Sequence, residues 1–122
     1  MIERYITMKN YSDLISYYEK ISEQWGEYTA NGGNASKANR LYKKIRAIEP
    51  QIKETEDGKQ RLLSFLDHTN GYVRLNAAVA LLDTFPCQAE KCLANLAKEK
   101  ETLGFISEIT LEEWRKGELK IV

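Results

Sequence analysis

Side chains that commonly catalyse reactions or bind metals are few and scattered in this sequence. His68 is the only histidine, so one chain cannot supply a catalytic pair of histidines or a metal site built on several. Cys87 and Cys92 lie five residues apart in a predicted helix, which turns their side chains roughly 140° from each other and argues against a disulfide or a shared metal. The sequence also has no glycine-rich phosphate loop and no nucleophile elbow. We therefore expect no catalytic residues, no metal and no other cofactor.

One arginine is predicted to hold the fold together. Arg74 stands in an apolar segment, where a buried guanidinium requires acceptors at close range. We expect it to pair with Asp67 or with carbonyl groups at the end of the preceding helix. Trp114, on the apolar face of the last predicted helix, is a third residue with an expected structural role.

A basic stretch offers a weak signal for nucleic-acid binding. Its residues lie in one predicted helix but do not share one side of it, and the only interleaved aromatic, Tyr42, falls on the apolar stripe. A solvated helix face is the simpler interpretation. The stretch consists of Lys37, Arg40, Lys43, Lys44 and Arg46.

Apolar residues recur at steps of three and four through most of the chain, which predicts α-helices. The predicted helices span residues 12–31, 34–52, a short segment from 57, then 72–84, 86–97 and 103–116. Asn34 suits a helix start, Pro86 a first turn and Gly117 a stop. Pro50 is expected either to kink the second helix or to split it. The first ten residues are ambiguous between a short helix and an extended arm.

The bulk properties indicate one folded domain. A chain of 122 residues with 43% hydrophobic and 30% charged residues can bury a core. Eighteen basic residues balance eighteen acidic ones, so the total charge does not steer the chain toward phosphate or an anionic membrane. We find no membrane-spanning run and no secretory signal, which predicts a cytoplasmic location.

Residues 60–85 resemble a HEAT repeat, with Leu62, Leu63 and Leu66 on a first helix and Val73 to Leu82 on a second. The wider pattern resembles a small bacterial family of HEAT-like domains of unknown function. The resemblance implies an all-α fold, a right-handed stack of about three antiparallel helix pairs. On this interpretation residues 1–122 form one domain, with an amino-terminal helix or cap at 1–33 and the helical repeats at 34–119. The residues that carry the wider pattern are Asn39, Arg40, Val73, Arg74, Ala77, Ala78, Pro86, Ala89, Leu93 and Glu113 to Gly117.

In such a stack the second helix of each pair lines a concave surface. The polar residues that repeat along one side of segment 72–84 are therefore the predicted partner-binding strip, with a packed structural strip as the alternative. The strip consists of Tyr72, Asn76, Val79 and Asp83. Tyr11 and Tyr17 lie beside the apolar stripe of the first helix and are further partner-binding candidates. The alternative for these two is that they pack under the amino-terminal arm.

These observations predict a non-enzymatic domain that binds another protein. The resemblance adds a specific form, an immunity protein that neutralises a bacterial toxin by direct binding and occlusion. The alternatives are a HEAT-like module associated with nucleic acid, which the neutral charge disfavours, and a structural subunit.

Overall fold

The computed structural model of the chain describes residues 11–30 and 34–119. Within them the chain forms six α-helices and one short 3₁₀ helix, with no strand, so the predicted all-α class is confirmed for the described residues. The expectations for residues 1–10 lie outside this part. The elements are α2 (Tyr11–Ala30), α3 (Ala35–Ile52), α4 (Glu56–Ser64), η1 (Phe65–Asp67), α5 (Gly71–Leu81), α6 (Pro86–Leu96) and α7 (Glu101–Arg115).

Several helix ends follow from local sequence signals. The side chain of Asn34 accepts a hydrogen bond of 3.0 Å from the third amide of α3, which confirms it as the cap. Asn70 caps α5 in the same way, accepting from two amides at 2.8 and 3.2 Å. Pro86 occupies the first turn of α6, and Gly117 takes a positive φ of 74° just after α7.

Pro50 does not split the second helix. It lies in the last turn of α3, which continues to Ile52. The proline lacks the N–H that would have bonded the carbonyl of Arg46, and this loss falls where the helix is about to end. Of the two expected outcomes, a kink or a split, the split is therefore wrong.

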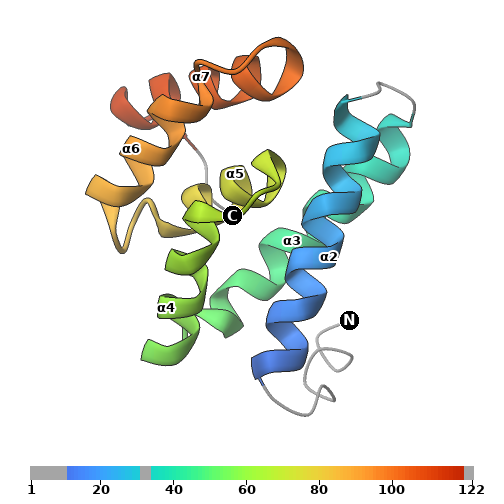
Figure 1. The fold of residues 1–122 in the computed structure, drawn as a ribbon, viewed down its shortest axis with the longest axis vertical. Coiled ribbons are helices and arrows are strands. Elements are labelled where there is room, and N and C mark those ends of the chain that lie inside the picture. Colours follow the sequence, from blue (N-terminus) through green and yellow to red (C-terminus); the bar gives the residue numbers. More distant parts are fainter. Residues whose placement is uncertain (1–10, 31–33, 120–122) are drawn as a thin grey trace.

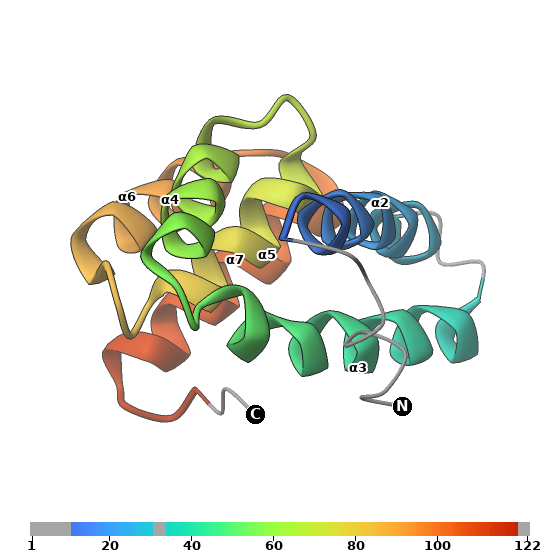
Figure 2. The same cartoon turned by 90° about the horizontal axis from the view of Figure 1, so that it is seen from below.

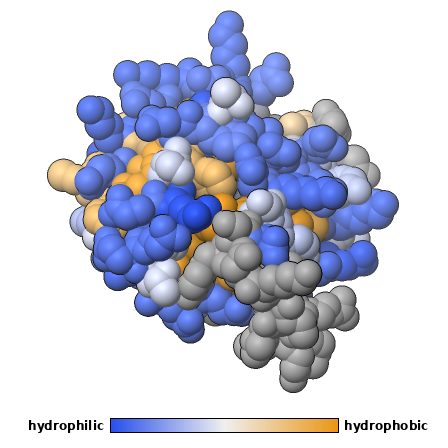
Figure 3. Space-filling view, turned by 60° about the horizontal axis from the view of Figure 1, so that its bottom comes forward, coloured by the Kyte–Doolittle hydropathy of each residue, from blue (hydrophilic) through white to orange (hydrophobic). Residues whose placement is uncertain are grey.

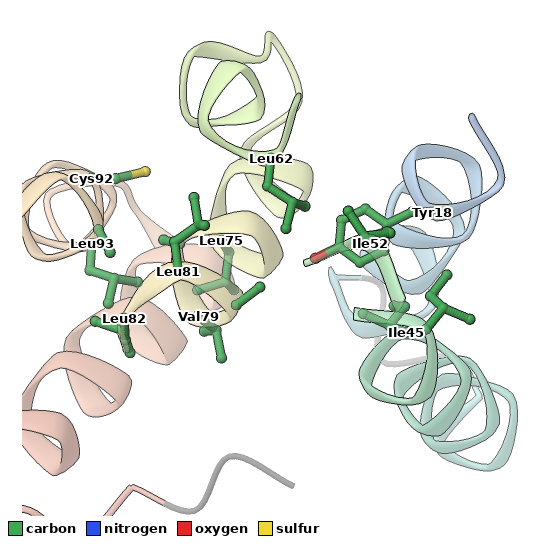
Figure 4. Close-up of a cluster of buried hydrophobic side chains, with 14 of the residues drawn as sticks. Tyr18, Ile45, Ile52, Leu62, Leu75, Val79, Leu81, Leu82, Cys92 and Leu93 are labelled. Atoms are coloured by element: carbon green, nitrogen blue, oxygen red, sulfur yellow. The ribbon is translucent and has the colours of Figure 1, made fainter. Parts of the chain in front are cut away.

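α5 is the central helix, as its apolar sequence predicts. It packs against each of the other five helices (Figures 1 and 2). Figure 4 shows Leu75, Val79 and Leu81 of α5 among buried side chains that come from α2, α3, α4 and α6. Eight of its eleven residues are buried, so expulsion of water from α5 holds the fold together.

α2 and α3 form a hairpin whose helices run in opposite directions (Figure 1). α2 also approaches α5 closely, because a Cβ atom added at Gly26 would lie 2.6 Å from the ring of Tyr72. α6 packs on α5, and α7 packs on α6. In the described part of the chain, no helix is both long enough and apolar enough to cross a bilayer.

Candidate functional site

The predicted partner-binding strip on α5 does not form an exposed surface. Asn76 has 0% of its surface exposed and Val79 has 8%. Tyr72 is half-buried, with its ring 5.6 Å from that of Trp25 in an edge-to-face contact. Only Asp83 is exposed, and it accepts a 3.0 Å ion-pair contact from Lys53. The assignment of Asn76 and Val79 to a docking surface is therefore wrong, because other helices surround α5 on this side.

Asn76 instead belongs to a buried polar network that joins three helices. Its side-chain oxygen accepts a 3.0 Å hydrogen bond from Arg46 Nη2 on α3. Arg46 Nη1 donates to Glu49 Oε2 one turn further along α3, and Tyr18 on α2 donates its hydroxyl to the same oxygen at 2.7 Å. The network thus fixes α2, α3 and α5 relative to one another.

The charges in this network are almost fully removed from water. Arg46 and Glu49 are 8% and 3% exposed. Burial raises the pKa of the Tyr18 hydroxyl well above its usual value, and the Glu49 carboxylate raises it further. Burial alone would lower the pKa of Arg46, but the Glu49 carboxylate first, and then the hydroxyls of Tyr18 and Tyr42, outweigh this and raise it. A neutral tyrosine and a buried ion pair suit a structural role rather than proton transfer.

Arg46 and Glu49 were missed as a pair in the sequence. Arg46 was assigned to the basic stretch, where its charge made it look solvated. A signal was present, since Glu49 follows Ile45 by four residues and precedes Ile52 by three, and therefore lies on the apolar stripe. A carboxylate on such a stripe needs a buried partner.

An exposed strip of α3 lies beside this network. We define the α3 face as Arg40, Lys43, Ala47 and Pro50, which recur at steps of three and four and are all exposed, with Tyr42 at its edge. Tyr42 is 40% exposed, and Arg46 stacks under its ring with the guanidinium carbon 4.8 Å from the ring centre. The strip therefore combines cations with an apolar, aromatic surface.

Two hollows meet at Tyr42. One, of about 450 Å³, lies on the α3 face. The other, of about 400 Å³, lies between α2 and α3 and is mostly apolar, with Trp25 and Tyr28 in its wall. The first is lined by Tyr42, Lys43, Arg46, Ala47 and Pro50, and the second by Trp25, Tyr28, Thr29, Ala35, Ala38, Asn39 and Tyr42.

The cations of α3 lack acidic partners in the described chain. Arg46 is paired with Glu49, but none of the other four basic residues forms an ion pair with a described carboxylate. Lys37 is instead placed 5.6 Å above the ring of Tyr28. The four are Lys37, Arg40, Lys43 and Lys44.

Large hydrophobic side chains are exposed on only two helices of the described chain. Tyr42 is on α3, and Phe105 and Ile109 are on α7, with Phe105 63% exposed. Hydrophilic side chains cover most of the face in Figure 3, and hydrophobic atoms gather toward its middle. Among the described residues, the large exposed hydrophobic side chains therefore single out α3 and α7.

Arg74 lies in the first turn of α5, and its side chain reaches the turn that precedes the helix. Its Nη1 donates a 2.6 Å hydrogen bond to the carbonyl oxygen of His68. Asp67 is exposed and forms no ion pair within the described residues, although it lines a hollow of about 290 Å³ together with Arg74. Of the two expected kinds of partner, Arg74 therefore has a backbone carbonyl. Trp114 donates its indole N–H to Glu90 at 2.8 Å, which ties α7 to α6.

The two tyrosines of the first helix are placed differently. Tyr17 is half-buried against the hydrophobic core and does not form part of the α3 face. The backbone of Tyr11 begins α2, but its side chain lies outside what the structure describes.

One group of side chains in the described chain has the spacing of a metal site. Ligand atoms of Glu19, Glu23 and His68 lie within 4.8 Å of one another. However, His68 Nδ1 accepts a 2.9 Å hydrogen bond from the amide of Asn70, so the neutral ring carries its proton on Nε2, which contacts Glu19 at 2.5 Å. A metal on Nε2 would require the other tautomer and would break the bond to Asn70. The cluster is better explained as a link between α2 and the turn before α5.

The cysteines also differ in environment. Cys87 is exposed and Cys92 is buried, and neither forms a disulfide. Burial raises the pKa of the Cys92 thiol to about 11, and this keeps it in the weakly nucleophilic thiol form near neutral pH.

Comparison with known proteins identifies a family. A family model described as "Domain of unknown function (DUF2019)" matches residues 12–110. No curated protein matches the chain. The chain is similar to the crystal structure of the protein RPA1889 from Rhodopseudomonas palustris CGA009, with a TM-score of 0.80 and 23% identity over 93% of this chain and 94% of that one.

These matches fit one part of the resemblance noted in the sequence. A helical domain of unknown function is what the sequence pattern indicated, and at 23% identity the solved structure supports the fold alone. The finer HEAT-like arrangement stays a prediction. Because the family model covers most of its length, the chain belongs to the family described as Domain of unknown function (DUF2019).

Proposed function

We propose that this domain acts without catalysis, by binding another protein through the α3 face. The observation that carries the proposal is the pair of hollows that meet at the exposed ring of Tyr42. Tyrosine, tryptophan and arginine around a concave apolar site are typical of the residues that dominate binding energy in protein interfaces. The buried network beneath Tyr42 supports this role, because it holds Arg46 and therefore the ring in place before a partner arrives.

The proposed architecture remains a right-handed, HEAT-like stack of about three antiparallel helix pairs. The contacts between consecutive helices, α2 with α3, α5 with α6 and α6 with α7, support it. The central, enclosed position of α5 departs from a simple solenoid, in which the second helices would line an open concave surface. Because α5 is enclosed, the partner docks on α3 rather than on α5 in this proposal.

In its most specific form, the proposal is an immunity protein that occludes a toxin domain in the cytoplasm. The basic α3 face suits a toxin with an acidic surface, rather than the basic surface usual for nucleases. The test is co-expression with a toxin encoded beside this gene. Restored growth that is lost in Tyr42→Ala would support immunity, whereas unchanged toxicity with the wild-type protein would contradict it.

Site-specific photo-crosslinking tests the broader proposal. A photoreactive amino acid replaces Ala47, in the middle of the α3 face, and as a matched control replaces Gln88, which is exposed on α6. In the cells that produce the protein, we expect a defined protein adduct at position 47 only. Equal adducts at both positions, or none at position 47, would contradict a docking surface on α3.

Duplex nucleic acid is a second candidate partner, favoured by the four cations of α3 that lack acidic partners. Two observations weaken it. The total charge of the chain is zero, so it gives no long-range attraction to phosphate, and Lys37 is already placed over the ring of Tyr28. Duplex binding that falls steeply with salt and disappears in Arg40→Glu would support this candidate, and absence of binding at low salt would dismiss it.

A further inference from the structure

We propose that the segment docking on the α3 face is the outer face of α7 in a second copy of this chain. The inference rests on the proposed function, because it names the partner of the same surface. The outer face of α7 is defined here as Phe105, Glu108, Ile109 and Glu112, all of them exposed.

The outer face of α7 presents an apolar anchor beside acidic groups. Phe105 and Ile109 are four residues apart and so lie next to each other on the helix surface, as do Glu108 and Glu112. Phe105 is 63% exposed, which leaves a large hydrophobic ring in contact with water. Neither glutamate forms an ion pair within the described chain. Both the ring and the carboxylates therefore lack partners that an interface would supply.

α3 and α7 carry opposite charge. α7 contains four glutamates and one arginine. α3 contains five basic residues and one glutamate, and that glutamate is already neutralised by Arg46 inside the protein. Opposite potentials on two helices of a neutral chain attract one copy to the next and fix their orientation.

The spacing of apolar and charged groups matches between the two helices. On α3, Lys43 precedes Pro50 by seven residues, and on α7, Phe105 precedes Glu112 by seven residues. Seven residues span roughly 10 Å of helix. If the two helices pack in opposite directions, Phe105 can enter the hollow beside Pro50 while Glu112 reaches Lys43. If the two helices packed in the same direction, this register would place Phe105 against Lys43 and Glu112 against Pro50.

The contact must form between copies. Within one chain α3 and α7 each pack on α5, but they do not form one of the main helix–helix contacts with each other. A contact made by one helix from each copy is small, so the association is expected to be weak.

Sedimentation equilibrium of the full chain tests the inference. The wild-type protein is measured up to about 1 mM, where an association with a dissociation constant of about 1 mM is half occupied. We expect reversible association that weakens as salt rises. Lys43→Glu should reduce the association constant about tenfold or more by placing like charges together, and Lys91→Glu, an exposed lysine on α6, should leave it unchanged.

Charge exchange makes the test specific to the proposed register. Glu112→Lys alone should weaken association as Lys43→Glu does, and the chain with both substitutions should associate nearly as well as wild type. Phe105→Ala should also weaken association. A wild-type chain that stays monomeric throughout, or a double variant no better than either single one, would overturn the inference.

The crosslinking experiment separates this inference from the broader proposal. An adduct at position 47 with twice the mass of the chain supports the second copy. An adduct with any other protein alone would overturn the self-docking inference and still support the α3 face as a docking surface.

Discussion

Glu49→Gln removes one charge from the buried network and keeps the size of the side chain. Glutamine can still accept the hydroxyl of Tyr18, but it no longer neutralises Arg46. The guanidinium then stays inside the protein without a counter-charge, although the amide oxygens of residue 49 and of Asn76 can still accept hydrogen bonds from it. The free energy of unfolding falls mainly because a charge is left buried without a counter-charge, and not because one contact is lost.

The expected loss of unfolding free energy is about 3–5 kcal/mol, the usual cost of breaking a buried ion pair. The upper part of this range applies because both partners are nearly inaccessible to water. Such a loss is a large share of the roughly 5–15 kcal/mol that stabilises a domain. In urea, with a slope of about 1.5 kcal/mol per molar, the unfolding midpoint should fall by roughly 2–3 M. Circular dichroism at 222 nm measures this midpoint.

Two further variants make the result interpretable. Glu113→Gln changes an exposed glutamate on α7 and should alter stability by less than about 0.5 kcal/mol. Arg46→Met combined with Glu49→Gln removes both charges and should be more stable than Glu49→Gln alone. A loss below about 1 kcal/mol in Glu49→Gln, or a double variant less stable than the single one, would refute the buried-charge reasoning.

Four other tests concern the turn before α5, the packing of α2 on α5 and the buried thiol of Cys92. Arg74→Ala should lower the unfolding free energy by about 1.5–3 kcal/mol, measured by urea titration, because a turn carbonyl loses a charged donor; no loss would remove its structural role. Gly26→Ala should cost about 1–3 kcal/mol, seen in the melting temperature, because the new methyl group collides with the ring of Tyr72; an unchanged melt would contradict the close packing. At pH 8 a thiol reagent should modify exposed Cys87 quickly and Cys92 only as the protein opens, and two fast thiols would contradict the buried site. Burial raises the pKa of the Cys92 thiol to about 11, above the ordinary thiol value. The free energy of unfolding should therefore be constant below the ordinary thiol pKa and fall as pH rises toward 11, because the thiol ionises first in the unfolded chain. Cys92→Ala should reduce this fall.

Helices could be predicted well from the sequence because their signals are local. Asn34, Pro86 and Gly117 mark ends through their own backbone and side-chain chemistry, and each acts where expected. The apolar character of segment 72–84 correctly predicted a central helix, since burial follows directly from composition. These features depend on residues close together in the chain.

The candidate site could not be predicted in the same way because it depends on tertiary contacts. Asn76 looked like a surface residue, yet its only described partner is Arg46, thirty residues away. Which side of α5 faces water is decided by the packing of α2 and α3, and helical spacing does not specify it. Tyr42 lies on an apolar stripe of the sequence, and its exposure likewise depends on how α3 packs against α2.

Amide spectra of the ¹⁵N-labelled full chain, recorded from dilute to concentrated solution, test the α3 docking surface most directly. We expect the shifts that depend on concentration to fall in residues 40–50 of α3 and 105–112 of α7, and to be reduced in Lys43→Glu but not in Lys91→Glu. Shifts that fall instead on α4 and α6, or spectra that do not change with concentration, would contradict docking of α7 on the α3 face.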